Sequence, residues 1–349
     1  MQFGIFGSAQ AGSLHLGPET GQGFRDYLDH AIEAEALGFH ASFLVEHHFT
    51  GWNQVSATLM LQTALAMRTT KLRLGTAVIV LPWHNPVLLA EQAATLDQIS
   101  GGRLDFGIGR GYRHNEFAGF CIPQDEATPR FEESVEVMIR SWTSRARFSH
   151  RGRFWQFDEI VVEPPPLQQP HPPLWVAAGS DASIRRAAER GFNLILDQYA
   201  SPEQHGQRIA LYRSVREAKG LGFHPMQVAV ARQVHVADSR AEAEAELEKQ
   251  ARWTRRTVEV SRTPGGAIGG SHVLSYAATA AGTEANACFG TADEVCERLI
   301  ALRAAGVEYV LLTPFSGPEQ LRRFAREVMP AFNGTTAERE IRTSQPAPA

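Results

Sequence analysis

Strand-like and helix-like segments alternate along this chain almost to its end, and this alternation restricts the possible folds more than any other feature. Apolar residues at helical spacing alternate with short β-branched runs, which are typical of parallel strands buried on both faces. The expected strands are residues 2–6, 40–45, 72–80, 104–108, 174–178, 193–196, 227–236 and 307–312. The expected helices are residues 23–37, 55–68, 87–99, 130–142, 181–190, 202–219, 240–255, 291–305 and 318–331. Eight strands, each followed by a helix, predict an α/β fold of the closed (β/α)8 type, the TIM barrel.

The turns from helix to strand repeat one pattern, in which a glycine ends the helix and a hydrophobic residue opens the strand. The pattern occurs at Leu37-Gly38-Phe39, Arg190-Gly191-Phe192 and Ala305-Gly306-Val307. Glycine suits the left-handed backbone that ends many helices, so the pattern indicates a repeated β-α unit. An open doubly wound sheet is the alternative fold. It should carry a Gly-x-Gly-x-x-Gly phosphate loop after its first strand, and residues 7–22 contain none.

Two stretches interrupt the alternation, and we interpret both as loop insertions in one domain that spans residues 1–334. Residues 143–172 carry paired aromatic and basic side chains that suggest a small hairpin, followed by a proline-rich run. Residues 256–289 are rich in Gly, Ala, Ser and Thr. Residues 335–349 are expected to form a disordered tail.

Composition excludes several classes of protein. The formal net charge of the 349 residues is −4 with both signs interspersed, whereas nucleic-acid binding requires a basic face. The three cysteines, Cys121, Cys288 and Cys296, form neither a disulfide framework nor a Cys-x-x-Cys zinc motif. No apolar run reaches the roughly 18 residues of a membrane span, and the N-terminus is typical of a strand rather than a signal peptide. We therefore expect a cytoplasmic protein that binds neither nucleic acid nor membrane and holds no metal.

A barrel carries its functional side chains at the C-terminal ends of its strands. His47 and His48 follow the second strand, and because side chains alternate along an extended chain, only one of them easily faces the barrel mouth. A functional histidine and a pair of surface histidines are equally consistent with this position. Metal binding is less favoured, because it normally needs three ligands.

Two further regions are candidates for binding an anion. Arg110 lies among glycines that leave room for a flat ligand, and Arg130 begins the next helix, although each arginine could instead form a surface salt bridge. Gly179, Ser180 and Ser183 open the helix after the fifth strand, where free N–H groups and the helix dipole favour a phosphate. Ordinary N-capping by Ser180 explains that segment equally well.

Several segments, taken together and in order, resemble the bacterial luciferase family of flavin-dependent monooxygenases, α-subunit type. They are MQFGIF at 1–6, EHHFT at 46–50, GTAVIVLP at 75–82, LDQISGGRLDFGIGRG at 96–111 and VAAGSDAS at 176–183. The resemblance runs from residue 1 to about residue 200 and returns weakly at 289–300 and 328–332.

The resemblance implies an enzyme that takes reduced FMN as a co-substrate from a separate flavin reductase. With dioxygen it would oxygenate a small organic substrate through a flavin hydroperoxide. His47 matches the histidine implicated in the family's catalytic cycle. The residues implied to contact the cofactor are Ala77, Val78, Arg110, Arg130, Gly179, Ser180 and Ser183. Arginines and hydroxyls in this set would hold the phosphate, and Ala77–Val78 would be a cis peptide beneath the flavin ring.

The resemblance also implies a homodimer that pairs through helices in the first half of the barrel, where 55–68 and 87–99 are strongly apolar. Gly109 stands where luciferase has a reactive cysteine, and the residues around Asp197 also differ, so light emission is not implied. Two alternatives remain open. One is a deazaflavin-dependent hydride-transfer enzyme on the same barrel, and the other is a non-catalytic flavin-binding protein.

Overall fold

The computed structural model describes residues 1–12, 20–263, 265–266, 286–313 and 317–333. Its strands are β1 (Gln2–Gly7), β2 (Ala41–Leu44), β3 (Arg73–Thr76), β4 (Ile79–Val80), β5 (Leu104–Gly109), β6 (Phe148–Arg151), β7 (Gln156–Ile160), β8 (Leu174–Ala177), β9 (Asn193–Leu196), β10 (Val228–Val236), β11 (Cys288–Gly290) and β12 (Tyr309–Thr313). Its α-helices are α1 (Gln22–Ala36), α2 (Thr58–Ala66), α3 (Pro86–Ser100), α4 (His114–Gly119), α5 (Ala127–Thr143), α6 (Asp181–Glu189), α7 (Pro202–Ala218), α8 (Arg240–Val260), α11 (Ala292–Ala304) and α12 (Pro318–Glu327).

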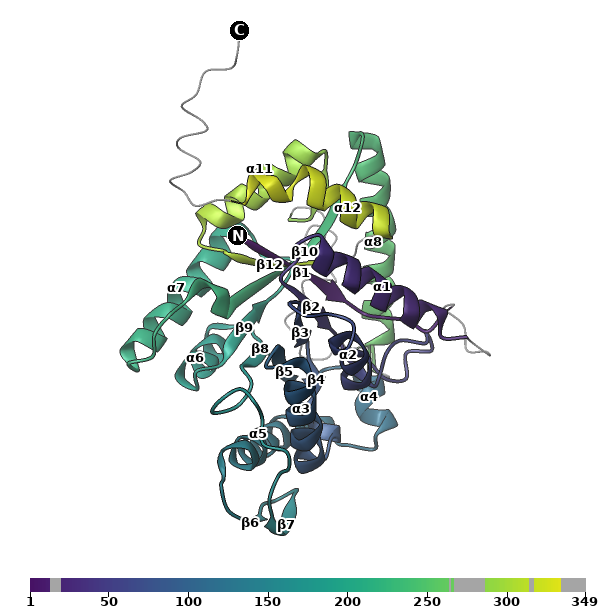
Figure 1. The fold of residues 1–349 in the computed structure, drawn as a ribbon. Helices are drawn as coiled ribbons and strands as arrows, with labels where there is room; N and C mark the ends of the chain where they lie inside the picture. Colours follow the sequence, from purple (N-terminus) through teal and green to yellow (C-terminus); the bar gives the residue numbers. More distant parts are fainter. Residues whose placement is uncertain (13–19, 264, 267–285, 314–316, 334–349) are drawn as a thin grey trace.

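In the described part of the chain, eight parallel strands close into a ring, and the helices lie outside it (Figure 1). The order around the ring is β1, β2, β3, β5, β8, β9, β10 and β12, and β12 pairs with β1 to close it. This topology confirms the predicted (β/α)8 barrel and excludes the open sheet. The short strands β4 and β11 pair with β5 and β10 respectively.

The predicted helix-to-strand turns are confirmed by their backbone geometry. Gly38, Gly191 and Gly306 have φ angles of 90°, 76° and 94°. These values lie in the region that only glycine adopts at little cost. The three glycines therefore reverse the chain after α1, α6 and α11 and direct it into the following strand.

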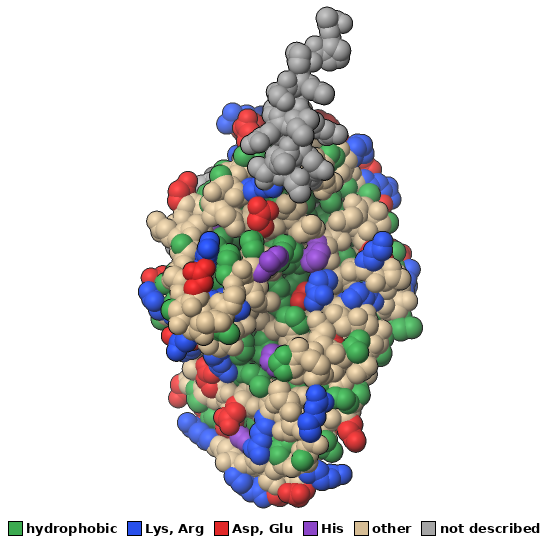
Figure 2. Space-filling model, turned by 60° about the vertical axis from the view of Figure 1, so that its left-hand side comes forward, with side chains coloured by type: hydrophobic (Ala, Val, Ile, Leu, Met, Phe, Trp, Pro, Cys, Tyr) green, Lys and Arg blue, Asp and Glu red, His purple; other side chains and the backbone are tan. Residues whose placement is uncertain are grey.

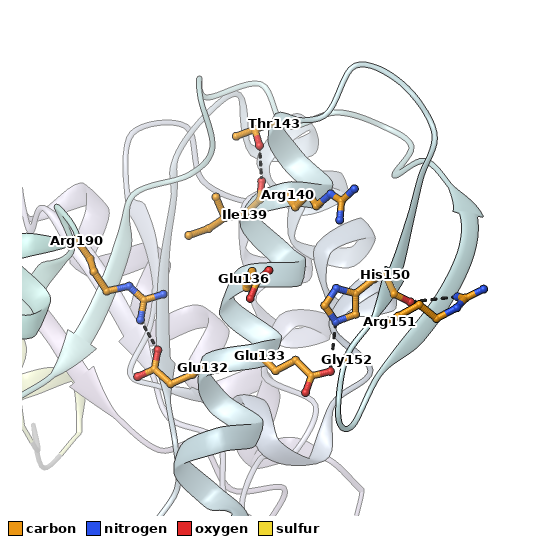
Figure 3. A pocket seen from close by; sticks show the side chains of 10 residues that line it. All are labelled: Glu132, Glu133, Glu136, Ile139, Arg140, Thr143, His150, Arg151, Gly152 and Arg190. Carbon is orange, nitrogen blue, oxygen red and sulfur yellow. Dashed lines mark hydrogen bonds and ion pairs between the residues drawn. The ribbon is translucent and has the colours of Figure 1, made fainter.

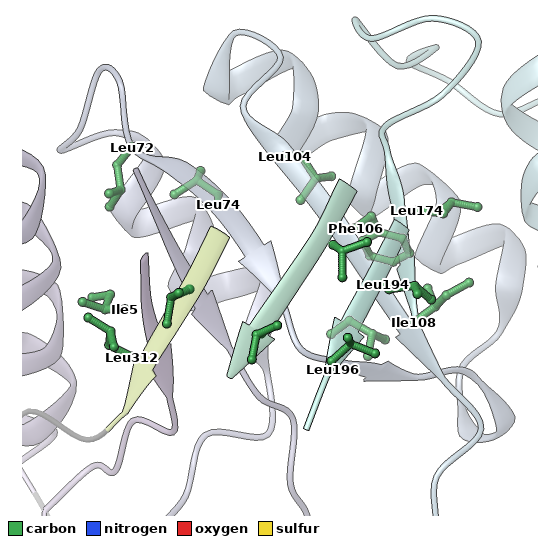
Figure 4. Close-up of a cluster of buried hydrophobic side chains, with 14 of the residues drawn as sticks. Ile5, Leu72, Leu74, Leu104, Phe106, Ile108, Leu174, Leu194, Leu196 and Leu312 are labelled. Atoms are coloured by element: carbon green, nitrogen blue, oxygen red, sulfur yellow. The ribbon is translucent and has the colours of Figure 1, made fainter. Parts of the chain in front are cut away.

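The main hydrophobic core lies between the outer faces of the barrel strands and the surrounding helices. Figure 4 shows part of it, including Ile5, Leu74, Phe106, Leu194 and Leu312, all of which are buried. Because adjacent residues of a strand point to opposite faces, the residues between these positions point into the barrel.

The interior of the barrel is filled by a second, smaller cluster. Phe43 packs edge to face against Trp175 with ring centroids 5.6 Å apart, and Trp175 packs against Tyr309 at 6.0 Å. Arg73 and Asp105, at the N-terminal starts of their strands, form an ion pair with Nε and Oδ2 2.6 Å apart. Bulky and charged side chains thus close the bottom of the barrel.

On β3, β5 and β8, the side chains of the inner face become smaller toward the C-terminal ends of the strands. Ala77, Gly107, Gly109 and Ala177 occupy inner-face positions in or directly after β3, β5 and β8. The barrel is therefore closed below, and β3, β5 and β8 contribute little side-chain bulk at its mouth, which is where enzymes with this fold bind their substrates.

The predicted strand 72–80 is not continuous. It divides into β3 and β4, and the peptide bond between Ala77 and Val78 lies in the break. A Cβ atom on Gly107 would collide with the carbonyl oxygen of Thr76, and one on Gly109 would collide with the side chain of Val78. The glycines of β5 thus allow this break to lie against their strand. From the sequence, these glycines are expected to give access to a flat ligand, whereas the structure shows that they make room for the neighbouring segment of the chain.

The first insertion contains the predicted hairpin, since β6 and β7 pair antiparallel within 143–172. The predicted helix 240–255 ends too early, and its extension shortens the second insertion, expected at about 256–289. α8 continues to Val260 because Thr254 and Val258 are buried against the barrel, which outweighs the weak helix propensity of these β-branched residues. At the other end, β11 begins at Cys288. The rest of this insertion, apart from a few residues, and the tail 335–349 lie outside the described residues.

On the face that Figure 2 shows, Lys and Arg side chains are interspersed with Asp and Glu, and histidines lie beside hydrophobic side chains near the centre. Within the described residues, no helix is long and apolar enough to span a membrane.

Candidate functional site

The barrel topology brings most of the predicted site residues to neighbouring positions at the mouth. His47 follows β2, Ala77 and Val78 follow β3, Arg110 follows β5, and Ser180 follows β8. These four strands are consecutive neighbours in the ring, although 133 positions separate the first and last of these residues in sequence (180 − 47). The predicted residues therefore lie along one half of the mouth.

His47 is held by a buried carboxylate. Its Nδ1 donates a hydrogen bond of 3.0 Å to Oε1 of Glu116 on α4, and the same oxygen accepts the backbone N–H of His48. The side chain of Glu116 is 2% exposed and that of His47 is 15% exposed. Because a carboxylate can only accept, this bond assigns the proton to Nδ1 and leaves the Nε2 lone pair available. Nε2 has no protein partner in the described part of the chain.

His48 belongs to a separate hydrogen-bond group, so the two histidines do diverge as alternation requires. Its Nε2 donates to Glu46, whose carboxylate also accepts Nε2 of His84 at 2.7 Å and the N–H of Val80 at 2.6 Å. Burial raises the pKa of Glu46, but these three hydrogen bonds outweigh it and lower the pKa overall. Glu46 therefore ties the segment after β2 to the segment after β4.

The surroundings of His47 favour its neutral form. Burial lowers the pKa of His47, the positive charge of Arg113 lowers it further, and the hydrogen bond and charge of Glu116 partly oppose both effects. The net pKa lies below the ordinary value of 6.5, so the ring is neutral at pH 7 and its Nε2 can accept a proton. The geometry and the pKa together suit a general base.

Replacing Glu116 by glutamine is expected to lower the pKa of His47 further. The change removes the negative charge that favours the imidazolium ion while keeping an oxygen that can accept from Nδ1. Titration of the His47 ring by NMR measures the pKa. The matched control is Glu126→Gln, which removes a carboxylate that pairs with Arg130 instead of His47. An unchanged or higher pKa in Glu116→Gln would contradict the assigned role of this carboxylate.

The two predicted arginines have different surroundings. Arg110 is exposed, and within the described residues its side chain makes one hydrogen bond, from Nη1 to Oγ1 of Thr128, at a long 3.3 Å. Arg130 instead forms an ion pair with Glu126 at 2.8 Å and lies over the ring of Phe154. Arg110 is thus available for a ligand, whereas Arg130 would have to leave an existing partner.

Ser180 and Ser183 form a capping box at the start of α6, so the N-capping interpretation is confirmed. The Ser180 hydroxyl accepts the N–H of Ser183, and the Ser183 hydroxyl donates to the Ser180 carbonyl at 2.7 Å. Ser180 is exposed and Ser183 half-buried. Capping does not prevent a hydroxyl from also contacting an anion, because each hydroxyl oxygen has two lone pairs.

The peptide bond between Ala77 and Val78 is cis, as the family resemblance implied. β4 continues beyond it and pairs with the end of β5, with Val80 opposite Gly109. The bond therefore lies at the mouth, between the segment that carries His47 and the segment that carries Arg110.

Two parts of the site could not be found from the sequence. Glu116 is 69 positions from His47, on a short helix that the apolar pattern does not predict. The loop after β9 is held by Asp197, which accepts the N–H groups of Tyr199 and Ala200 and pairs with Arg208 at 2.7 Å. The two histidines at a strand end do predict that buried groups accept their hydrogen bonds, but the sequence does not identify Glu116 as one of these acceptors.

A hollow on the outer layer has a structural explanation. It lies between α5 and the β6–β7 hairpin (Figure 3). Glu133 accepts the N–H groups of Phe154 and Trp155 and bonds to His150, while Glu132 pairs with Arg190. These contacts attach the hairpin to the barrel. Among the described residues, no group of three or more His, Cys, Asp or Glu is arranged to hold a metal ion.

Known proteins resemble this chain over most of its length. The family described as luciferase-like monooxygenase matches residues 1–309. The oxygenase component of the flavin-dependent trigonelline monooxygenase of Acinetobacter baylyi is 29% identical over 327 residues, which are 89% of this chain and 90% of that protein. The FMNH2-dependent dimethylsulfone monooxygenase of Pseudomonas putida is 28% identical over 331 residues, 88% of this chain and 87% of that protein.

Solved structures share the fold. Monooxygenase RslO1 from Streptomyces bottropensis superposes with a TM-score of 0.78 at 30% identity, covering 95% of this chain and 100% of its own. An F420-dependent secondary alcohol dehydrogenase has a TM-score of 0.74 at 20% identity, covering 95% of this chain and 99% of its own. At that lower identity, the likeness shows the fold alone.

Proposed function

The chain belongs to the luciferase-like monooxygenase family, and on this premise we propose that it is the oxygenase component of a two-component system. It takes reduced FMN from a separate flavin reductase and uses dioxygen to oxygenate a small organic substrate. Relatives that align over nearly nine-tenths of the chain support this proposal, one by its FMNH2 dependence and another as an oxygenase component.

The residues at the mouth fit FMN. The phosphate would be held by Arg110, which is exposed and weakly bound, with the hydroxyls of Ser180 and Ser183 and the N–H of Gly179. β5 and β8 are neighbours in register, with Ile108 opposite Val176, so the segments that follow them lie side by side. Arg130 could contact the phosphate only if its ion pair with Glu126 were broken.

The flavin ring would lie over Ala77 and Val78, where inner-face side chains are small. Reduced FMN supplies the electrons that activate dioxygen. The contribution of the chain is to bind and orient the reactants, to exclude water and to move a proton at Nε2 of His47.

The observation that carries the proposal is the bond between His47 and Glu116. It fixes the proton on Nδ1 and leaves Nε2 without a partner among the described residues, while burial and the charge of Arg113 lower the pKa of His47 and keep the ring neutral near pH 7. A non-catalytic flavin carrier has no need of a buried acid that orients a histidine in this way.

Reduced FMN is expected to bind more tightly than reduced FAD, because the mouth offers one phosphate site and no second pyrophosphate-binding loop. Anaerobic titration of both reduced flavins measures the affinities, and consumption of dioxygen by the flavin-loaded protein then tests for activity. Clearly tighter binding of FAD would contradict the phosphate assignment. FMN binding without dioxygen activation would favour a flavin carrier, and hydride transfer from a reduced deazaflavin would favour the other alternative.

The protein is expected to form a homodimer through α2 and α3, which contact each other on one side of the barrel. Met60 on α2 and Leu88 on α3 are 76% and 56% exposed, and large exposed apolar patches commonly mark interfaces. Light scattering at micromolar concentration should give twice the chain mass, and Met60→Glu with Leu88→Glu should give the monomer. Ile300→Glu is the matched control, since Ile300 is 49% exposed on α11. A wild-type monomer would contradict this interface.

A further inference from the structure

Arg113 is a buried cation at the mouth that the proposed function does not yet use. The residue is 3% exposed. Its Nε and Nη1 atoms are buried and have no hydrogen-bond partner in the part of the chain that the structure describes. Its guanidinium carbon lies 5.9 Å from the centre of the Tyr112 ring, which cannot satisfy these N–H groups.

The nearby carboxylates do not neutralise this charge. Glu116 bonds to His47 and to the backbone of His48, and Glu46 bonds to His48 and His84. Within the described residues, neither carboxylate comes close enough to Arg113 to form an ion pair. A buried cation with unsatisfied N–H groups is costly, so an anionic ligand that accepts from these groups would remove that cost.

The position of Arg113 connects it with the reacting centre. It lies four positions after the end of β5, and its carbonyl oxygen accepts the N–H of Glu116, the residue that bonds to His47, at 3.2 Å. Its positive charge also lowers the pKa of His47. Arg110, three residues earlier, is exposed and reaches α5 instead. The two arginines are therefore separate: one is accessible from outside, whereas the other is buried beside the proposed base.

We propose that Arg113 binds a carboxylate of the organic substrate and places the substrate next to His47. The proposal rests on the proposed function and narrows its substrate class from small organic molecules to organic acids. A guanidinium suits a planar carboxylate, and charge-assisted hydrogen bonds to it are about twice as strong as neutral ones. The neutral amide of the same acid would leave the cation without a counter-charge.

The test compares carboxylic acids with their amides on the flavin-free protein. The probes are acetate and acetamide, benzoate and benzamide, and 1-naphthoate and 1-naphthamide, titrated by calorimetry at pH 7. We expect the wild type to prefer at least one acid over its amide by about 10- to 100-fold. Arg113→Gln should abolish this preference, Arg113→Lys should retain part of it, and Arg240→Gln, which removes an exposed arginine of α8, should leave it intact.

A second measurement distinguishes the substrate from the flavin, because a reduced flavin ring is also an anion. Arg113→Gln should leave the affinities for oxidised and reduced FMN within about 2-fold of the wild type, far less than the loss of one charge-assisted hydrogen bond. Selective weakening of reduced FMN would overturn the proposal and assign Arg113 to the cofactor.

Two other results would overturn it, namely no acid preference in the wild type and a preference that persists in Arg113→Gln. Circular dichroism establishes whether each variant is folded. If Arg113→Gln does not fold, the reduced acid preference expected for Arg113→Lys provides the test instead. The acid–amide comparison needs no flavin. A wild type that binds no FMN would therefore refute the proposed function, whereas the acid–amide comparison would still test whether Arg113 binds a carboxylate.

Discussion

Replacing His47 by alanine is expected to lower productive turnover of reduced FMN and dioxygen by about 10²–10⁴-fold, the usual contribution of a positioned acid or base. The imidazole is neutral at pH 7, and its bond to Glu116 holds Nδ1 and leaves Nε2 without a partner among the described residues. The variant should keep its fold, because the ring is 15% exposed and lies at the barrel mouth instead of in the hydrophobic core, and it should bind FMN normally.

Stopped-flow absorbance of the reduced flavin mixed with dioxygen measures the rate, and an assay for hydrogen peroxide measures unproductive oxidation. The control at the neighbouring position should be His48→Gln instead of alanine. His48 donates to Glu46 and packs edge to face against Phe120 at 4.9 Å, so a truncation there would disturb the site by itself. Equal losses in both variants would indicate local unfolding. Normal turnover in His47→Ala would remove the main catalytic assignment.

The second large effect is expected for Arg110→Ala, which should weaken FMN binding by about 1.5–3 kcal/mol, or roughly 10- to 150-fold, through loss of a charge-assisted phosphate contact. The free protein should be equally stable, since Arg110 is exposed and makes one weak bond to Thr128. Fluorescence titration with FMN measures the loss.

Riboflavin, which lacks the phosphate, is the matched ligand and should bind the variant and the wild type alike. Arg240→Ala is the matched protein control, because the side chain of this arginine on α8 is 85% exposed and pairs with Glu244. If Arg110→Ala binds FMN as the wild type does, the phosphate site lies elsewhere. An equal loss for riboflavin would instead indicate damage to the ring site.

The sequence predicts the barrel because its evidence is local and repeated. Buried strands and amphipathic helices impose their periods on consecutive residues, and the glycines after α1, α6 and α11 reveal where each helix must turn. The order of strands in a (β/α)8 ring then places His47 and Arg110 at the same mouth. The family resemblance adds the cis bond at Ala77, which no local pattern predicts.

Only the tertiary structure decides which groups these residues meet. The carboxylate that orients His47 comes from a helix 69 positions away, Arg130 pairs with Glu126, and Arg113 becomes a buried cation beside the base. None of these contacts produces a periodic pattern in the sequence, because each depends on how loops that follow different strands pack together at the barrel mouth. The physical reason is that periodicity records which face of an element is buried, whereas hydrogen-bond partners and burial of single charges depend on side chains brought together from distant parts of the chain.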